Sequence, residues 1–178
     1  MIHMKKNKAI VVFIATMALL LSSVVGFNSM FSQAKRVAYG QSNALQQAQN
    51  YLNFAPFSKK GLIKQLKFEG YSDNEAKYAV KNCGANWKDQ AERKAIDYLN
   101  TAPFSKSGLI KQLKFEGFTA KQAEYGVKNC GANWKKQAVK KGKQYLDSMP
   151  FSKSRLISQL KYEGFTKKQV NYAIKKIY

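Results

Sequence analysis

The strongest constraint on this chain is an internal repeat with a period of 47 residues. Residues 57–70 read FSKKGLIKQLKFEG, and residues 104–117 repeat this phrase with one change. Residues 151–164 repeat it again as FSKSRLISQLKYEG. Self-similarity at a fixed period is typical of arrays in which each copy is one small supersecondary unit. A unit of this length is too small to be stable alone, so we expect neighbouring units to pack on one another.

A second repeated phrase sets the bounds of the units. KNCGANWK occurs at 81–88 and again at 128–135, with the same period. Together the two phrases predict unit one at 44–84, unit two at 85–131 and unit three at 132–178.

The spacing of apolar and capping residues predicts three helices in each unit. In unit one the first is expected at Ala44–Phe54 and the second at 59–69, after a serine that suits an N-cap. Gly70 suits the left-handed position that ends a helix. Ser72, with Glu75 three residues later, has capping-box spacing and predicts the start of the third helix. The fold class is therefore all-α, with three tandem trihelical helix-turn-helix repeats.

An uncharged, apolar segment at 9–27 precedes the units and follows three lysines. This pattern is typical of a transmembrane anchor or a signal helix, and its length favours an uncleaved single-pass anchor. The small residues at 32–34 leave cleavage near Ala34 as the alternative, which would make the protein secreted. We expect a linker at 28–43 and the repeats on the extracellular face of the cell membrane, because long downstream domains are translocated largely regardless of charge.

The charge balance is strongly basic, with 31 lysine and arginine residues against 10 acidic residues. The excess grows along the chain, because unit three carries the largest surplus of lysine over acid. Such a surface attracts polyanions, namely nucleic acid, anionic lipid headgroups or phosphate-rich envelope polymers. The alternative is a solvated lysine-rich surface with no fixed partner.

Outward-facing lysines and tyrosines form the candidate partner-binding surface. On the second helix of each unit, lysines are expected opposite the apolar stripe, and on the third helix a tyrosine points away from the core alanines. Such a surface suits phosphate contact, stacking or a protein-binding hot spot. The alternative for each tyrosine is packing against a helix of the next unit. The residues are Lys60, Lys64, Lys67, Tyr78, Lys111, Lys114, Tyr125, Lys161 and Tyr172.

Tryptophan and cysteine have structural interpretations. Trp87 and Trp134 begin the helices that link successive units and are expected to pack between units. Cys83 and Cys130 occupy the same position in two units, too far apart to form a disulfide, and are expected to be small buried residues. The sequence contains none of the usual nucleophile, phosphate-loop or zinc-protease motifs and has no cysteine–histidine cluster. We expect no enzyme activity, no metal or other cofactor and no small-molecule substrate.

The repeated phrases resemble those of the Ltp family, which are host cell surface-exposed lipoproteins found in prophages and bacteria. The resemblance rests on Phe-Ser-Lys-x-Gly-Leu-Ile-x-Gln-Leu-x-x-Glu-Gly-Phe, followed by Ala-x-Tyr-x-Val and Gly-Ala-x-Trp, and covers residues 44–178. It implies tandem helix-turn-helix repeats displayed outside the membrane. It also implies superinfection exclusion, in which a resident prophage makes a protein that stops the DNA of an incoming phage from entering the cell. The partner implied is the injection machinery, a phage tail or tape measure protein, or the channel through which the DNA passes.

The chain departs from that family in one respect. A lipoprotein needs a cysteine just after its signal, and no cysteine precedes Cys83. The 9–27 segment is the natural substitute for a lipid anchor. Two alternative functions remain open from the residues alone: a basic helix-turn-helix DNA-binding protein, and a module that binds an anionic envelope polymer or lipid.

Overall fold

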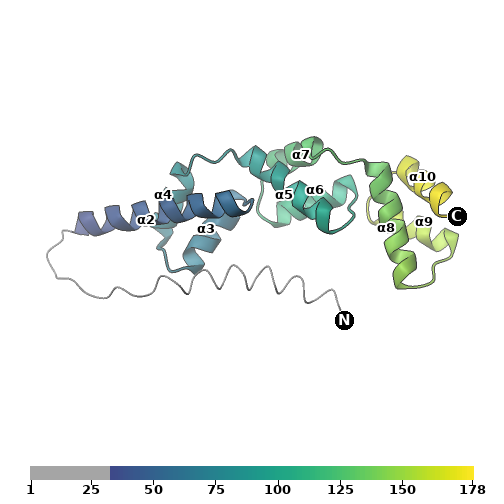
Figure 1. The fold of residues 1–178 in the computed structure, drawn as a ribbon, viewed down its shortest axis with the longest axis horizontal. Coiled ribbons are helices and arrows are strands. Elements are labelled where there is room, and N and C mark those ends of the chain that lie inside the picture. Colours follow the sequence, from purple (N-terminus) through teal and green to yellow (C-terminus); the bar gives the residue numbers. More distant parts are fainter. Residues whose placement is uncertain (1–32) are drawn as a thin grey trace. The chain divides into compact units, whose positions relative to one another are not determined.

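The computed structural model describes the backbone of residues 33–178 and the side chains of residues 39–178. Within this part of the chain the secondary structure is entirely helical, and Figure 1 shows the helices in three successive groups along the chain. Each group corresponds to one of the three sequence units. The helices are α2 (Gln33–Phe54), α3 (Lys59–Phe68) and α4 (Asp73–Asn82) in unit one; α5 (Trp87–Thr101), α6 (Lys106–Phe115) and α7 (Ala120–Asn129) in unit two; and α8 (Trp134–Ser148), α9 (Lys153–Tyr162) and α10 (Lys167–Ile177) in unit three.

The ends of the short helices follow the capping residues in the sequence. Ser58 is the N-cap of α3 and its hydroxyl accepts a hydrogen bond from the backbone N–H of Gly61. Ser72 and Glu75 form the predicted capping box at the start of α4. Gly70 has a φ of 94°, a left-handed conformation that only glycine adopts without strain, and it allows the sharp turn between α3 and α4. The equivalent caps recur in units two and three.

The first helix differs from the prediction, because α2 begins at Gln33 rather than near Ala44. Residues 33–43, which were expected to belong to a linker, therefore continue the helix upstream. No proline interrupts this stretch, and the packed part of α2 supplies a nucleus from which the helix extends upstream, through the poor helix formers Gly40 and Asn43 to Gln33. The predicted anchor at 9–27 lies outside the described residues. Among the helices from residue 33 onward, none is long and apolar enough to cross a membrane.

Each unit has its own apolar core. In unit two, Leu109 and Leu113 from α6 are fully buried and pack with Ala91 and Ala95 from α5 and Val127 from α7. Units one and three bury the equivalent side chains. The first residue of the three core clusters is Ala44. A fragment that begins at Gln33 therefore includes every core residue of the part of the chain that the structure describes. The predicted apolar stripes are confirmed.

Tryptophan side chains join each unit to the one before it. Trp87, the first residue of α5, packs against the core cluster of unit one. Trp134, the first residue of α8, packs against the core cluster of unit two. The prediction that both residues pack between units is confirmed. The cores of successive units are therefore joined by apolar contacts, as expected for a repeat array.

Buried serine hydroxyls form a second connection between successive units. The Ser58 hydroxyl donates to the backbone oxygen of Glu116 at 2.5 Å, and the Ser105 hydroxyl donates to that of Glu163 at 2.5 Å. Both serines also cap their own helices, so each hydroxyl makes two hydrogen bonds. Ser152, the counterpart in unit three, is exposed, and its hydroxyl lies 3.1 Å from that of Ser154.

Unit three differs from the other units around Phe151, at the start of its second helix. Arg155 occupies the position held by Gly61 and Gly108 in the other units, and its guanidinium lies 5.2 Å from the centre of the Phe151 ring. The Tyr178 hydroxyl donates to the backbone oxygen of Phe151 at 2.8 Å. In units one and two the equivalent glycine lies near the backbone of the following unit, at Glu116 and Glu163 respectively.

Candidate binding surface

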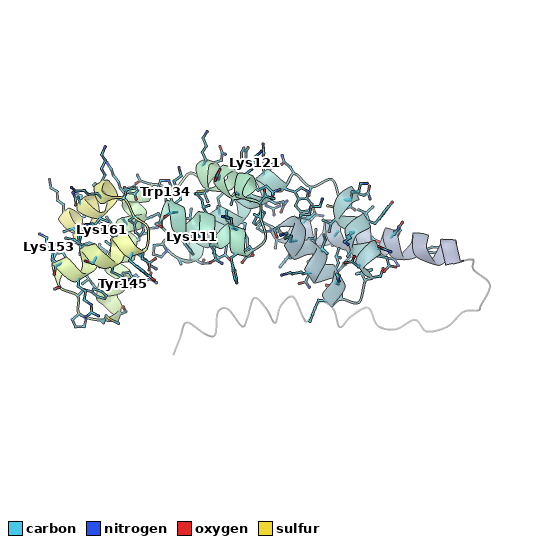
Figure 2. The ribbon with its side chains drawn as sticks, turned by 180° about the vertical axis from the view of Figure 1, so that it is seen from behind. Lys111, Lys121, Trp134, Tyr145, Lys153 and Lys161 are labelled. Carbon is cyan, nitrogen blue, oxygen red and sulfur yellow. The ribbon has the colours of Figure 1, made fainter. Side chains whose placement is uncertain are left out.

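The lysines predicted to lie on the second helices are all exposed. Helices α3, α6 and α9 contain several lysines and no acidic residue. Figure 2 labels Lys111 and Lys161 on α6 and α9, whose apolar sides are buried in the unit cores. The sequence prediction of a basic face is therefore confirmed as a structural feature. The exposed residues are Lys60, Lys64, Lys67, Lys111, Lys114 and Lys161.

One acidic residue partly neutralises this face in unit one. Asp73 pairs with Lys77 at 2.5 Å and with Lys67 at 3.0 Å. Hydrogen bonds from Lys77 and Lys67 hold the pKa of Asp73 below its ordinary value, so the carboxylate stays charged. Ala120 and Lys167 take this position in units two and three. This position therefore changes from acidic in unit one to neutral in unit two and basic in unit three.

The aromatic residue that ends each second helix is a further exposed feature, which was not among the predicted binding residues. Phe68, Phe115 and Tyr162 are exposed by 85%, 88% and 88%, the highest values among the large hydrophobic side chains of the described residues. Their signal was present in the sequence, because Phe68 follows the core residue Leu66 by two positions, about 200° around the helix. An apolar residue in a repeated helical phrase is typical of a core position, so helical spacing is needed to place these three rings on the outer face.

The tyrosines on the third helices are less available than predicted. Lys88 covers the ring of Tyr125 at 5.3 Å from its centre, and Lys135 covers that of Tyr172 at 5.5 Å. Each lysine comes from the first helix of the same unit, so these two rings pack at least partly against their own unit. Tyr78 is 40% exposed, and the position of its covering lysine is occupied by Gln41 in unit one. Open aromatic surface is therefore concentrated on the second helices.

A hydrogen-bonded network connects the C-terminal half of each first helix to the second helix of the same unit. In unit two the Tyr98 hydroxyl donates to a carboxylate oxygen of Glu116 and accepts from the Gln112 amide at 3.0 Å. Lys94 lies 3.5 Å from the second oxygen of Glu116, so this glutamate also forms an ion pair. Burial raises the pKa of Tyr98 above its ordinary value, and the hydrogen bond to Glu116 raises it further. The network satisfies polar groups and aligns α5 with α6.

Unit three repeats this network, whereas unit one lacks its cation. Lys141 lies 3.7 Å from Glu163 in unit three. In unit one Gln47 occupies the lysine position, and its amide donates to Glu69 at 3.1 Å. Burial raises the pKa of Glu69, and the hydrogen bond from Gln47 offsets this only in part. Ionised Glu69 is therefore less well compensated than its counterparts.

Gln47→Lys is expected to stabilise unit one by restoring the ion pair of the other units. The new cation should lower the pKa of Glu69, which NMR titration of its side chain can measure. In the wild-type protein the folded-state pKa of Glu69 lies above its ordinary value of 4.5. The free energy of unfolding therefore falls as the pH rises from the ordinary pKa through the folded-state pKa. The gain should therefore be present near neutral pH and disappear at low pH, with a size of about 0.5 kcal/mol. Gln47→Met is the control, and an unchanged Glu69 pKa in the lysine variant would contradict the assignment.

The described residues contain no group of three or more metal-ligating side chains. Cys83 and Cys130 are half-buried free thiols, and each donates a weak hydrogen bond to a backbone oxygen one turn earlier. These residues act as parts of the unit cores. The arrangement of exposed lysines and aromatic rings is suited to binding a large partner surface, and no catalytic family is indicated.

Comparison with known proteins agrees with this repeated architecture. The sequence profile of the host cell surface-exposed lipoproteins called Ltp matches three successive segments, 40–83, 86–130 and 133–177. The chain belongs to the Ltp family. The matched segments correspond closely to the three structural units, which confirms the tandem trihelical fold. No curated protein sequence matches the chain.

A solved structure from the Ltp family is similar to the chain. It is that of Ltp, a superinfection exclusion protein from the Streptococcus thermophilus temperate phage TP-J34. The two chains are 31% identical, the match covers 53% of this chain and 98% of the other, and the TM-score is 0.50. This chain is thus homologous to a phage superinfection exclusion protein. Surface exposure is a property of the family, and the segment of this chain predicted to be an anchor, 9–27, lies outside the described residues.

Proposed function

We propose that this Ltp-family protein is a membrane-tethered superinfection exclusion protein that stops incoming phage DNA from entering the cell. The observation that carries the proposal is the match of all three units to a family that includes a phage exclusion protein. In this proposal the units engage the phage injection machinery, either a tail or tape measure protein or the channel through which DNA passes. In this proposal the protein acts by binding and not as an enzyme. Its effect therefore depends on the fraction of the partner molecules to which it is bound.

The exposed faces of the units support a binding role. Each unit presents lysines on its second helix, and three similar units in one chain raise the effective concentration of binding sites. A single-pass anchor at 9–27 would hold the units outside the cell and close to the membrane. An injection complex must cross the region that the tethered units occupy.

The decisive experiment is phage challenge of cells that express the full chain, with adsorption and DNA uptake scored separately. We expect normal adsorption and blocked uptake, because a protein acting on injection leaves the phage receptor free. A protease added to intact cells should degrade the units, which tests the expected topology. Reduced adsorption would instead indicate receptor masking, and unhindered uptake by every phage tested would overturn the proposal.

Nonspecific DNA binding is the second candidate function, and the net charge of +21 favours it. Duplex binding through lysine should weaken steeply as salt rises, because phosphate contacts release counterions. Sequence-specific recognition has less support, since the third helices contain no arginine, the side chain most often used for base readout. A fluorescence anisotropy titration with duplex DNA at low salt tests this function, and absence of binding excludes it.

A further inference from the structure

Each second helix carries exposed lysines that lead to an exposed aromatic ring at its last residue. We call this arrangement the aromatic–lysine patch. Its ring lies at the C-terminal end of the helix, and in units one and two the lysine four residues earlier, Lys64 or Lys111, is its neighbour on the helix surface. The patches consist of Lys60, Lys64, Lys67 and Phe68 in unit one, Lys111, Lys114 and Phe115 in unit two, and Lys161 and Tyr162 in unit three.

The rings have no structural role in the described chain. Phe68, Phe115 and Tyr162 belong to none of the three core clusters of the described residues. A single exposed apolar residue needs no explanation, but here every unit exposes its aromatic residue at the same place. The position in unit three carries tyrosine rather than phenylalanine and still presents a ring.

The chemistry of the patch argues against two kinds of partner. The cores of protein interfaces are depleted in lysine, whereas each of these helices carries two or more lysines and no acidic residue. Duplex DNA accounts for the lysines but not for the rings, because aromatic residues stack on the bases of single strands. A suitable partner must accept a protruding ring and positive charge without requiring a shaped pocket.

An anionic membrane surface meets these requirements. Aromatic rings settle at the boundary between headgroups and acyl chains, and nearby lysines interact with lipid phosphates. We propose that the three aromatic–lysine patches dock the units onto an anionic phospholipid surface, with the rings inserted and the ammonium groups at the headgroups. This inference does not depend on the exclusion function. The apolar segment at 9–27 would keep the patches near the bilayer, so three weak contacts suffice.

The test uses a fragment of residues 33–178, which contains the three core clusters of the described residues. Its binding is measured to phospholipid vesicles of two compositions. Circular dichroism first checks that the fragment and its variants retain their helix content. Co-sedimentation then compares vesicles of phosphatidylcholine alone with vesicles in which about one third of the lipid is phosphatidylglycerol. We expect binding to the anionic vesicles, and strong weakening by salt. Absence of binding, or equal binding to both compositions, overturns the proposal.

Two sets of substitutions separate the contributions of ring and charge. Replacing Phe68, Phe115 and Tyr162 together by serine should weaken binding to anionic vesicles at least about tenfold, because the inserted apolar area is lost. Removing one lysine near an anionic surface weakens binding about fivefold, so removing five should reduce it by more than about a hundredfold. The five substitutions are Lys60→Gln, Lys64→Gln, Lys67→Gln, Lys111→Gln and Lys114→Gln.

Matched controls lie elsewhere on the same units. Phe54→Ser removes an exposed ring that is 72% accessible and lies outside the patches, and it should leave binding unchanged. Replacing five lysines of the third helices removes the same charge from another face and should weaken binding much less. Those residues are Lys77, Lys81, Lys121, Lys128 and Lys168. Equal losses from both lysine sets would overturn the proposal by showing that net charge alone governs binding.

Phage challenge distinguishes lipid docking from contact with a phage component. The triple serine variant is expressed as the full chain, and its vesicle binding is measured in parallel on residues 33–178. Retained vesicle binding together with lost exclusion would show that the rings contact the phage, and this result overturns lipid docking while leaving the exclusion function intact. Loss of vesicle binding with exclusion retained would support docking and leave exclusion independent of it.

Discussion

Trp134→Ala is expected to lower the free energy of unfolding of the array by about 2–3 kcal/mol, somewhat less than the loss typical of a fully buried tryptophan. Trp134 belongs to unit three, yet its half-buried side chain packs against the core cluster of unit two. The substitution removes apolar area from that contact and leaves a gap at the junction. Because repeat arrays are stabilised by contacts between neighbouring units, the loss should also reduce the cooperativity between units two and three.

Thermal unfolding followed by circular dichroism and calorimetry measures both effects. We expect a lower midpoint and a broadened or divided transition for Trp134→Ala. Trp134→Phe should retain part of the contact and fall between the alanine variant and the wild type. Lys136→Ala, an exposed position on the same helix, is the surface control. A transition for Trp134→Ala that keeps the wild-type midpoint and width would show that the tryptophan does not couple the units.

Gly126→Ala is expected to destabilise unit two by about 2 kcal/mol, although alanine is the better helix former. Helix α7 approaches α5 so closely at Gly126 that a β-carbon there would lie 2.5 Å from the carbonyl carbon of Ala91 and 2.8 Å from the backbone nitrogen of Glu92. These are backbone atoms of a packed helix, so relief of the clash requires α5 and α7 to separate. The overpacking cost exceeds the gain in helix propensity, which is about 1 kcal/mol.

Gly142→Ala is the matched control for this prediction. A β-carbon at Gly142 would also meet an atom at 2.5 Å, but that atom is the terminal methyl carbon of Ile177. The Ile177 side chain can change its rotamer, so the cost of the clash is small and roughly cancels the gain in helix propensity. Urea denaturation of both variants should show a marked loss for Gly126→Ala and a change near zero for Gly142→Ala. Equal stability of the two variants would contradict the account of the close helix approach.

The boundaries of the short helices were predictable from the sequence because their determinants act over a few residues. Ser72 with Glu75 closes a capping box, and Gly70 ends the preceding helix, as the sequence predicted. The lysines of the second helices were correctly placed outside the core, since the apolar stripe of Leu62 and Leu66 defines the opposite face. The family resemblance, confirmed by the sequence profile, supplied the functional expectation that composition alone did not contain.

The sequence by itself thus determined the number of units, the helices within them and the basic face, because capping hydrogen bonds and helical periodicity are local. Only the tertiary structure decided which side chains meet within each unit and between successive units. It placed Lys88 on Tyr125 of its own unit, tied Ser58 to the backbone of Glu116 and left Phe115 exposed. These outcomes depend on how closely helices cross and on the rotation from one unit to the next. Such distances arise from the packing of whole side-chain surfaces, which the spacing of residues along one helix does not specify.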